Sequence, residues 1–243
     1  MTRVHLVLGA TGSIGSAVAR RLHQAGHTVF LAGRNPQTLA ALAAELGAPS
    51  MVVDATDAAA VDAAVNATVE HGGRIDGAFN GVGSLLLKAA HHTRDEEFAA
   101  VMATHVNSSF FLLRACVRRM EAGGSIVLVS SAAARIGLAN HEAIAAAKGA
   151  VEGLALSAAA TYAARGIRIN VVAPGLVRSG ITERIFSSEA ALKGSVAMHP
   201  LGRAGEPDDV ARSAVFFLDG DNSWITGQVL GVDGGLADLK TRA

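Results

Sequence analysis

The sequence VHLVLGATGSIG, residues 4–15, decides the fold of this chain. Its first part, Val4–Leu8, is an apolar run typical of a buried strand, and three glycines follow before a helical pattern begins. Glycines between a strand and a helix let backbone N–H groups approach a diphosphate at the positive end of the helix. A glycine-rich turn with a purely structural role is the alternative. We expect nucleotide contacts from Gly9, Thr11, Gly12, Ser13, Ile14 and Gly15.

The rest of the chain repeats the same alternation of apolar runs and helical patterns. Strands are predicted at residues 28–32, 50–53, 75–79, 124–130, 167–172 and 229–232, and helices at residues 36–46, 57–70, 94–121 and 140–164. This alternation predicts a parallel sheet with right-handed crossovers. We therefore expect an α/β fold, a Rossmann-type doubly wound parallel sheet of about seven strands, in a single domain over residues 1–243.

Composition excludes several classes of protein. Lysine plus arginine balance aspartate plus glutamate at 21 each, so no net charge attracts nucleic acid or an anionic membrane. The single cysteine, Cys116, excludes an internal disulfide and fits a reducing compartment. No apolar run approaches the ~20 residues of a membrane-spanning helix, which predicts a cytoplasmic protein. The expected partner is a small-molecule substrate. His91 and His92 are adjacent and have no nearby cysteine, so no metal site is expected.

The residue after the second predicted strand bears on the choice of dinucleotide. In dinucleotide-binding folds an acidic residue here binds the ribose 2′-hydroxyl, whereas an arginine accommodates a 2′-phosphate. Arg34 stands at this point and no acidic residue does. The sequence therefore favours NADP(H) over NAD(H) as cofactor. An exposed arginine that merely precedes a helix is the alternative.

The stretch SSAAARIGLANHEAIAAAK, residues 130–148, resembles the catalytic segment of the short-chain dehydrogenase/reductase family. In that family a tyrosine follows a serine by thirteen residues, and a lysine follows the tyrosine by four. Ser131 and Lys148 keep this spacing, but Ile144 occupies the tyrosine position. The resemblance covers essentially the whole chain, including the Asp-Gly-Gly of residues 233–235 near its end.

The resemblance implies further cofactor contacts. Asn80 and Gly81 are similar to a family segment that steadies the central sheet and lies against the cofactor. Asp54 resembles an acid that contacts the adenine amino group, although capping of the next turn explains it equally well. The family segment that flanks the nicotinamide corresponds to Pro174, Gly175 and Val177.

It also implies catalytic roles. In the family the serine polarises the substrate carbonyl, and the lysine binds the ribose and lowers the pKa of the tyrosine; these roles fall on Ser131 and Lys148. Asn107 matches a helix asparagine that holds a water between the lysine and solvent, so its side chain is expected to be buried and hydrogen-bonded. Subunit contacts between such helices imply a homo-oligomer, a dimer or a tetramer.

Ile144 cannot donate, accept or ionise, and general acid–base assistance is worth ~10²–10⁴-fold in rate. His141 precedes Ile144 by three residues and Lys148 by seven, so a helix would carry all three on one face. Histidine exchanges protons near neutral pH. We expect His141 to take part of the tyrosine's role, and a position at the helix entrance without such a role is the alternative.

Three functions stay open at this point. The first is an NADP(H)-dependent oxidoreductase with an altered proton donor, which the glycine turn, Arg34 and Lys148 favour. The second is a redox-neutral enzyme on the same fold that performs a dehydration, cyclisation or isomerisation. The third is a non-catalytic subunit that binds the cofactor or a partner.

Overall fold

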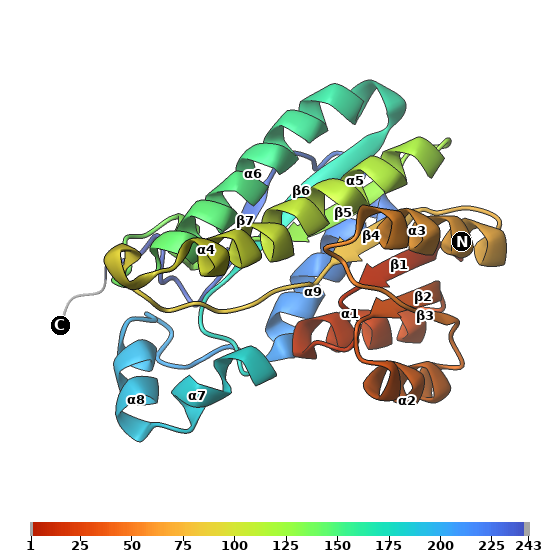
Figure 1. Ribbon diagram of the computed structural model, residues 1–243. Coiled ribbons are helices and arrows are strands. Elements are labelled where there is room, and N and C mark those ends of the chain that lie inside the picture. Colours follow the sequence, from red (N-terminus) through yellow and green to blue (C-terminus); the bar gives the residue numbers. More distant parts are fainter. Residues whose placement is uncertain (1, 241–243) are drawn as a thin grey trace.

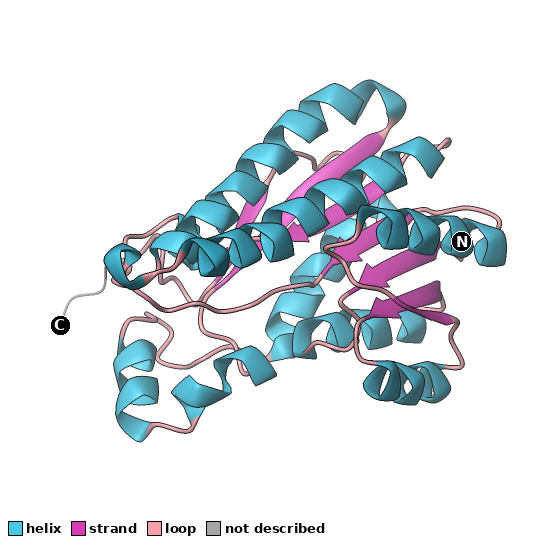
Figure 2. Ribbon diagram, viewed as in Figure 1, coloured by secondary structure: helices cyan, strands magenta, loops and turns pink. Residues whose placement is uncertain are grey.

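The computed structural model describes residues 2–240, which form one parallel sheet of seven strands flanked by helices (Figures 1 and 2). The strand order is β3-β2-β1-β4-β5-β6-β7. The strands are β1 Val4–Leu8, β2 Thr28–Gly33, β3 Ser50–Val52, β4 Gly77–Asn80, β5 Gly124–Val129, β6 Ile167–Pro174 and β7 Val229–Val232. The predicted fold class is confirmed, and the strand bounds differ from the predicted ones by two residues at most.

Helices cover both faces of the sheet, so the molecule has three layers (Figure 2). The helices are α1 Ser13–Gln24, α2 Pro36–Leu46, α3 Ala58–Gly72, α4 Asp95–Met102, α5 Ser108–Arg119, α6 Glu142–Tyr162, α7 Glu183–Phe186, α8 Glu189–Ala197 and α9 Pro207–Leu218. Helices α1, α2 and α9 lie on one face, and α3, α5 and α6 lie on the other (Figure 1).

The two faces of the sheet build two separate apolar clusters. Side chains alternate between the faces along a strand, so Leu6 and Leu8 of β1 pack with α3, α5 and α6, whereas Val7 packs with α1, α2 and α9. Strands buried on both faces explain why the sequence shows continuous apolar runs instead of alternation.

The helix predicted over residues 94–121 is interrupted. A π-helical turn, η2 Ala103–Asn107, separates α4 from α5. A π turn accommodates one more residue than regular α-helix and therefore rotates the residues around it. As a result His105 is buried and Asn107 is exposed.

Two helical segments of the described chain are long and apolar enough to cross a membrane, contrary to the expectation from sequence. Asp95–Arg119 and Glu142–Arg165 have mean hydropathies of 1.2 and 1.3. About half of each apolar window, 50% and 44%, is buried inside the fold. Their apolar residues pack on the sheet as part of its larger core cluster.

Strand order reverses between β1 and β4, because the chain returns from the β3 edge to continue on the other side of β1. In open parallel sheets the segments that leave the carboxyl ends of strands at such a point diverge and leave a crevice. Four segments meet at this edge here: residues 9–12 after β1, 81–89 after β4, 130–141 after β5 and 175–206 after β6. The sheet thereby brings the glycine turn, Ser131 and the segment of residues 174–177 to one edge.

Candidate active site

The turn between β1 and α1 needs two of its three glycines for its own packing. Gly9 has a φ of 78°, which favours glycine, and a Cβ there would lie 2.7 Å from the carbonyl carbon of Gly81. A Cβ on Gly15 would overlap the carbonyl oxygen of Gly9. A Cβ on Gly12, by contrast, would meet only this oxygen, at 3.4 Å, an ordinary contact. The protein alone therefore tolerates a larger residue than Gly12.

Gly12 is also the N-cap of α1, and within the described chain no side chain accepts a hydrogen bond from this helix start. The first N–H groups of a helix lack partners within the helix, and its N-terminus attracts anions. A glycine here keeps these groups accessible. The turn therefore fits a diphosphate group.

A cavity of about 280 Å³ lies beside the turn, and we call it the glycine-turn cavity. Segments at the carboxyl ends of β1, β2, β3 and β4 line it. Its lining includes Gly9, Thr11, Gly12, Arg34, Asp54, Thr56, Gly81, Val82, Gly83 and Ser84. Of the residues predicted to contact the nucleotide, Ser13, Gly15 and Asn80 line neither this cavity nor the two described below, and Gly15 packs against the Gly9 backbone.

Arg34 is exposed on the rim of the glycine-turn cavity, and no carboxylate of residues 2–240 forms an ion pair with it. Asp54 caps a turn: its Oδ1 accepts hydrogen bonds from the Thr56 backbone N at 2.9 Å and the Thr56 hydroxyl at 2.7 Å. These bonds, the backbone one foremost, lower the pKa of Asp54. The turn-capping role of Asp54 is thus present, and its carboxylate still faces the cavity.

A second cavity of about 150 Å³, the lysine cavity, lies next to the first. The two cavities share the wall formed by residues 81–84. The lysine cavity brings together most of the other predicted site residues, namely Ile14, Gly81, Ser131, Ile144, Lys148, Pro174, Gly175 and Val177.

Lys148 reaches from α6 to the end of β5, where its Nζ donates a hydrogen bond to the Val129 carbonyl oxygen at 2.7 Å. Its side chain is buried, and burial lowers the pKa of Lys148 to about 7. A buried amine with one partner has capacity for further hydrogen bonds. The lysine therefore retains donors for a ligand such as a ribose hydroxyl.

The two serines after β5 differ in role. The Ser130 hydroxyl is buried and donates to Glu152 Oε1 at 2.6 Å, which fixes β5 to α6. The Ser131 hydroxyl accepts from the Ala133 backbone N at 3.2 Å and lies 3.5 Å from the Pro174 carbonyl oxygen. Ser131 alone of the two lines both the lysine cavity and the cavity beyond it.

This third cavity, of about 360 Å³, lies under α7 and α8, and we call it the lid cavity. It shares Ser131, Ile144 and Gly175 with the lysine cavity, so the two cavities adjoin at these residues. His141 also lines it, as the N-cap of α6 and not within the helix as predicted. The His141 Nδ1 lies 2.7 Å from the Ala139 carbonyl oxygen. Because a carbonyl only accepts, Nδ1 is the donor, and Nε2 is left for other partners.

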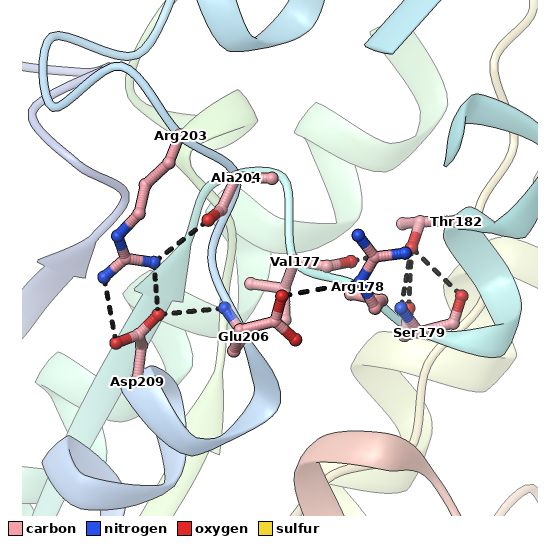
Figure 3. A network of polar contacts seen from close by, with 8 residues as sticks. All are labelled: Val177, Arg178, Ser179, Thr182, Arg203, Ala204, Glu206 and Asp209. Carbon is pink, nitrogen blue, oxygen red and sulfur yellow. Dashed lines mark hydrogen bonds and ion pairs between the residues drawn. The ribbon is translucent and has the colours of Figure 1, made fainter. Parts of the chain in front are cut away.

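The segment that carries α7 and α8, residues 178–204, is closed at its base and forms a lid (Figure 3). Val177 and Gly205 pair as an isolated parallel bridge, in which Gly205 N donates to the Leu176 carbonyl oxygen at 2.8 Å. Arg178 N donates to the Gly205 carbonyl oxygen at 3.0 Å. We call this pairing the neck of the lid.

Ion pairs flank the neck (Figure 3). Arg178 Nε lies 3.4 Å from Glu206 Oε1, and Arg203 donates to the two Asp209 oxygens at 2.7 and 3.1 Å. Thr182 Oγ1 donates to the Val177 carbonyl oxygen at 2.7 Å. The start of the lid and the start of α9 are thus held together by side chains from both sides.

Comparisons with known proteins agree with this geometry. A family model described as enoyl-(acyl carrier protein) reductase matches residues 9–237. A solved structure of a short-chain type dehydrogenase/reductase from Mycobacterium ulcerans is 32% identical and superposes with a TM-score of 0.93 over 97% of this chain and 90% of that chain. The chain belongs to the short-chain dehydrogenase/reductase family.

Relatives within the short-chain dehydrogenase/reductase family include one named as an oxidoreductase and one named as inactive. An uncharacterized oxidoreductase of Mycobacterium tuberculosis is 35% identical over 95% of this chain and 89% of its own length. A protein of Xanthobacter autotrophicus named inactive 2-(S)-hydroxypropyl-CoM dehydrogenase 2 is 36% identical over 91% of this chain and 100% of its own length.

Ile144, at the position where the sequence resemblance predicts a tyrosine, is 3% exposed. It packs with Val101, Ala143 and Ala147 in a small apolar cluster between α4 and α6. The same side chain lines both the lysine cavity and the lid cavity. The position therefore faces the site, and the residue there carries no group for proton transfer.

The expectation for Asn107 is wrong. Its side chain is exposed and forms no hydrogen bond within residues 2–240, because the π turn directs it outward. His105, two residues earlier, takes the buried position and lines the lysine cavity. Its Nε2 lies 3.2 Å from both the hydroxyl and the carbonyl oxygen of Ser84, whereas Nδ1 has no partner among the described residues.

Sequence reasoning missed His105. Burial, and then the charge of Lys148, lower the pKa of His105 to about 3, so its ring is neutral at physiological pH. Hydrophobic periodicity is averaged over a window of residues and does not locate a single inserted position. The only available signal was the polar His105 itself on a face that is otherwise apolar.

Asn80 lies behind the site and lines none of the three cavities. Its Nδ2 donates to the hydroxyls of Ser108 and Ser109, both at 3.1 Å, and its Oδ1 accepts from Val82 N. It therefore fixes β4 and the segment after it to α5, as the predicted steadying role requires, but does not face a cofactor. Among residues 2–240 no group of three or more potential metal ligands is clustered.

Proposed function

We propose that this chain is an NADP(H)-dependent oxidoreductase in which a group other than tyrosine transfers the proton. The arrangement of three adjoining cavities, each of which shares lining residues with the next, carries this proposal. The glycine-turn cavity suits the adenosine phosphates, the lysine cavity suits a nicotinamide riboside, and the lid cavity suits a substrate beside it. A redox-neutral reaction would not require all three of these adjoining cavities.

The choice of NADP(H) rests on Arg34. Its guanidinium is exposed on the rim of the glycine-turn cavity, and β2 ends without an acidic residue. Arginine binds phosphate through charge-assisted hydrogen bonds in a planar fork. An acidic residue that would bind a free 2′-hydroxyl and repel a 2′-phosphate is missing from this point of the sequence.

A bound nicotinamide would supply a hydride to the substrate carbon, or accept one from it. The Ser131 hydroxyl would donate a hydrogen bond to the substrate oxygen, and Lys148 would bind the ribose. His141 would give a proton from Nε2 to the oxygen of a ketone, which yields an alcohol and a neutral imidazole. In the oxidation the same nitrogen would take the hydroxyl proton.

The proposal is tested by titration of the purified protein with NADPH and with NADH, followed by nicotinamide fluorescence. We expect tighter binding of NADPH. Replacement of Arg34 by alanine should weaken NADPH binding roughly 10- to 100-fold, the value of a charge-assisted hydrogen bond, and leave NADH binding unchanged. Absence of binding of either nucleotide to the unmodified protein would refute the oxidoreductase function.

A second candidate, a non-catalytic cofactor-binding subunit, is favoured by one specific observation. Ile144 leaves the site without the group that protonates substrate in the family, and a 36% identical relative is named inactive. The two candidates predict the same nucleotide binding. They differ in turnover: a non-catalytic subunit would bind NADPH and oxidise it with no ketone or aldehyde.

We further propose a cytoplasmic homo-oligomer. Large apolar side chains remain exposed, among them Trp224 at 99%, Leu156 at 63% and Leu230 at 40%. Leu156 lies beside the loop that precedes β7, near Gly227. Exposed apolar patches of this kind mark protein–protein contacts. The single cysteine is buried and free, which fits a reducing compartment.

A further inference from the structure

The lid cavity is lined by no aspartate, glutamate, lysine or arginine among the described residues, and its two titratable side chains are His141 and His199. Its walls are mostly leucine, isoleucine, alanine and methionine, from the segment after β4, from α6, from α7 and α8, and from the chain end near Leu236. Its volume, about 360 Å³, is within the range of pockets that bind small organic ligands. Away from His141 and Ser131, a charged group of a ligand would find no counter-ion on this wall.

Most polar side chains on the wall are already engaged. His199 is 3% exposed and uses both ring nitrogens, with Nδ1 2.7 Å from the Ser195 carbonyl oxygen and Nε2 accepting from Leu176 N at 3.0 Å. Thr182 donates its hydroxyl to the Val177 carbonyl oxygen. These groups hold the lid to the end of β6 and are not free for a ligand.

The polar groups that remain are concentrated beside the lysine cavity. Ser131 lines both cavities, and His141 has its Nε2 without a partner among residues 2–240. Ser195 of α8 adds one hydroxyl on the lid side. A ligand therefore meets polar partners for one oxygen near Ser131 and an apolar surface beyond it.

The mouth of the lid cavity is apolar as well. Leu87, in the segment after β4, is 43% exposed, and Met198, after α8, is 48% exposed. The two side chains come from opposite walls of the cavity. Apolar side chains left exposed around a cavity indicate a surface that a ligand covers.

We infer that the substrate is an uncharged molecule with one oxygen function and an extended apolar body, which lies in the lid cavity with its oxygen at Ser131. This inference rests on the proposed function. A carboxylate or ammonium on the part of the ligand away from Ser131 and His141 would be desolvated without a partner, and a polyol would leave hydroxyls unpaired, so both classes are excluded. Apolar burial would supply most of the affinity.

Isothermal titration calorimetry with 2-heptanone, 2-octanone and 2-nonanone tests the inference. NADP⁺ is added at saturation, because it cannot reduce a ketone and no turnover occurs. We expect affinity to rise roughly three- to fourfold with each methylene. The matched acid 7-oxooctanoate, which carries a carboxylate at the far end of the same chain, should bind at least tenfold more weakly than 2-octanone.

A variant that reverses the preference for the uncharged ketone over the acid distinguishes this inference from a loss of folding. Ile185 lines the cavity from α7, and Ile185→Lys should lower the affinity for 2-octanone and raise that for 7-oxooctanoate. Phe216→Lys, at an exposed site of α9 outside the cavity, is the control and should change neither.

The outcomes separate this inference from the proposed function. Equal or tighter binding of the acid by the unmodified protein would overturn the inference. So would absence of ketone binding with normal NADP⁺ binding, which leaves the oxidoreductase in place. If the ketones bind with the predicted trend but NADP⁺ does not bind, the oxidoreductase function is refuted and the ligand class of the cavity is supported.

Discussion

Ile144 lies between an apolar cluster and the polar groups of the site. On one side lies the apolar cluster of Val101, Ala143 and Ala147, and on the other lie the cavities that contain Ser131 and Lys148. At this position an amphipathic side chain could pack its apolar part in the cluster and present a polar group at its end to the site. Isoleucine packs in the cluster but presents no polar group to the site. The chemistry of the site therefore depends on groups that lie around this position.

Replacement of Ile144 by tyrosine should bring a hydroxyl into the lysine cavity beside Ser131 and Lys148. Because acid–base assistance is worth ~10²–10⁴-fold, we expect reduction of ketones and aldehydes by NADPH to accelerate roughly 10²-fold. Ile144→Phe has nearly the same bulk without the hydroxyl and is the matched control. Equal rates in the tyrosine and phenylalanine variants would contradict the role assigned to this position.

His141 is the group available for proton transfer in the unmodified protein. His141→Ala should lower turnover roughly 10²-fold and leave NADPH affinity unchanged, because His141 lines the lid cavity and not the glycine-turn cavity. His23→Ala, an exposed histidine on α1, is the control. Steady-state kinetics and fluorescence titration separate the two effects, and full turnover in His141→Ala would exclude this role.

At the scale of elements, the π turn between α4 and α5 has the largest effect on the site. Strands, caps and most helix ends could be predicted from sequence, because they follow from apolar runs and from local signals such as Asn35 and Pro36 at the start of α2. The π turn could not, because it changes which residue faces inward without changing the composition of the segment. This is why Asn107 was expected in the position that His105 occupies.

Deletion of Asn107 should convert the π turn to regular α-helix. The turn contains one residue more than an α-helix needs, and the Asn107 side chain is exposed. We therefore expect the variant to fold with an unchanged or higher melting temperature. Deletion of the buried Ala115 from the regular part of α5 shifts buried positions and should destabilise the protein strongly. Similar losses in both deletions, measured by thermal unfolding, would contradict this account.

At the scale of the molecule, two buried histidines make stability depend on pH. His5 in β1 is 1% exposed, neither ring nitrogen has a partner among the described residues, and burial lowers the pKa of His5 to about 3. His105 has its pKa lowered to about 3 by the same cause. Unfolded histidine titrates near 6.5. Between pH 6.5 and 3 the unfolded chain thus binds more protons than the folded one, and acid favours unfolding.

We accordingly expect the free energy of unfolding to fall as the pH decreases from 6.5 toward 3. Denaturant unfolding at a series of pH values measures this slope. His5→Leu and His105→Asn should each reduce the slope, whatever their effect on stability at pH 7.5. The exposed His23 provides the control, since His23→Ala should keep the original slope. An unchanged slope in both core variants would contradict the assignment.

The predicted site residues converge because the topology requires it. Segments after β1, β4, β5 and β6 meet at one edge of any sheet with this strand order, so Gly9, Ser131, Lys148 and Gly175 could be placed near one another from sequence. The shape and polarity of the lid cavity could not be predicted. They depend on how α7 and α8 fold over the sheet, and the sequence of this segment has no strong periodicity.

The neck between Val177 and Gly205 gives the lid fixed ends. Whatever sequence lies between them, its two ends leave the fold side by side, held by the bridge and by the pairs of Arg178 with Glu206 and Arg203 with Asp209 (Figure 3). Insertions and exchanges are tolerated where the ends of a segment stay in place. Residues 179–202 can thus be exchanged as one segment. Such an exchange could change the ligand preference while the dinucleotide-binding sheet stays the same.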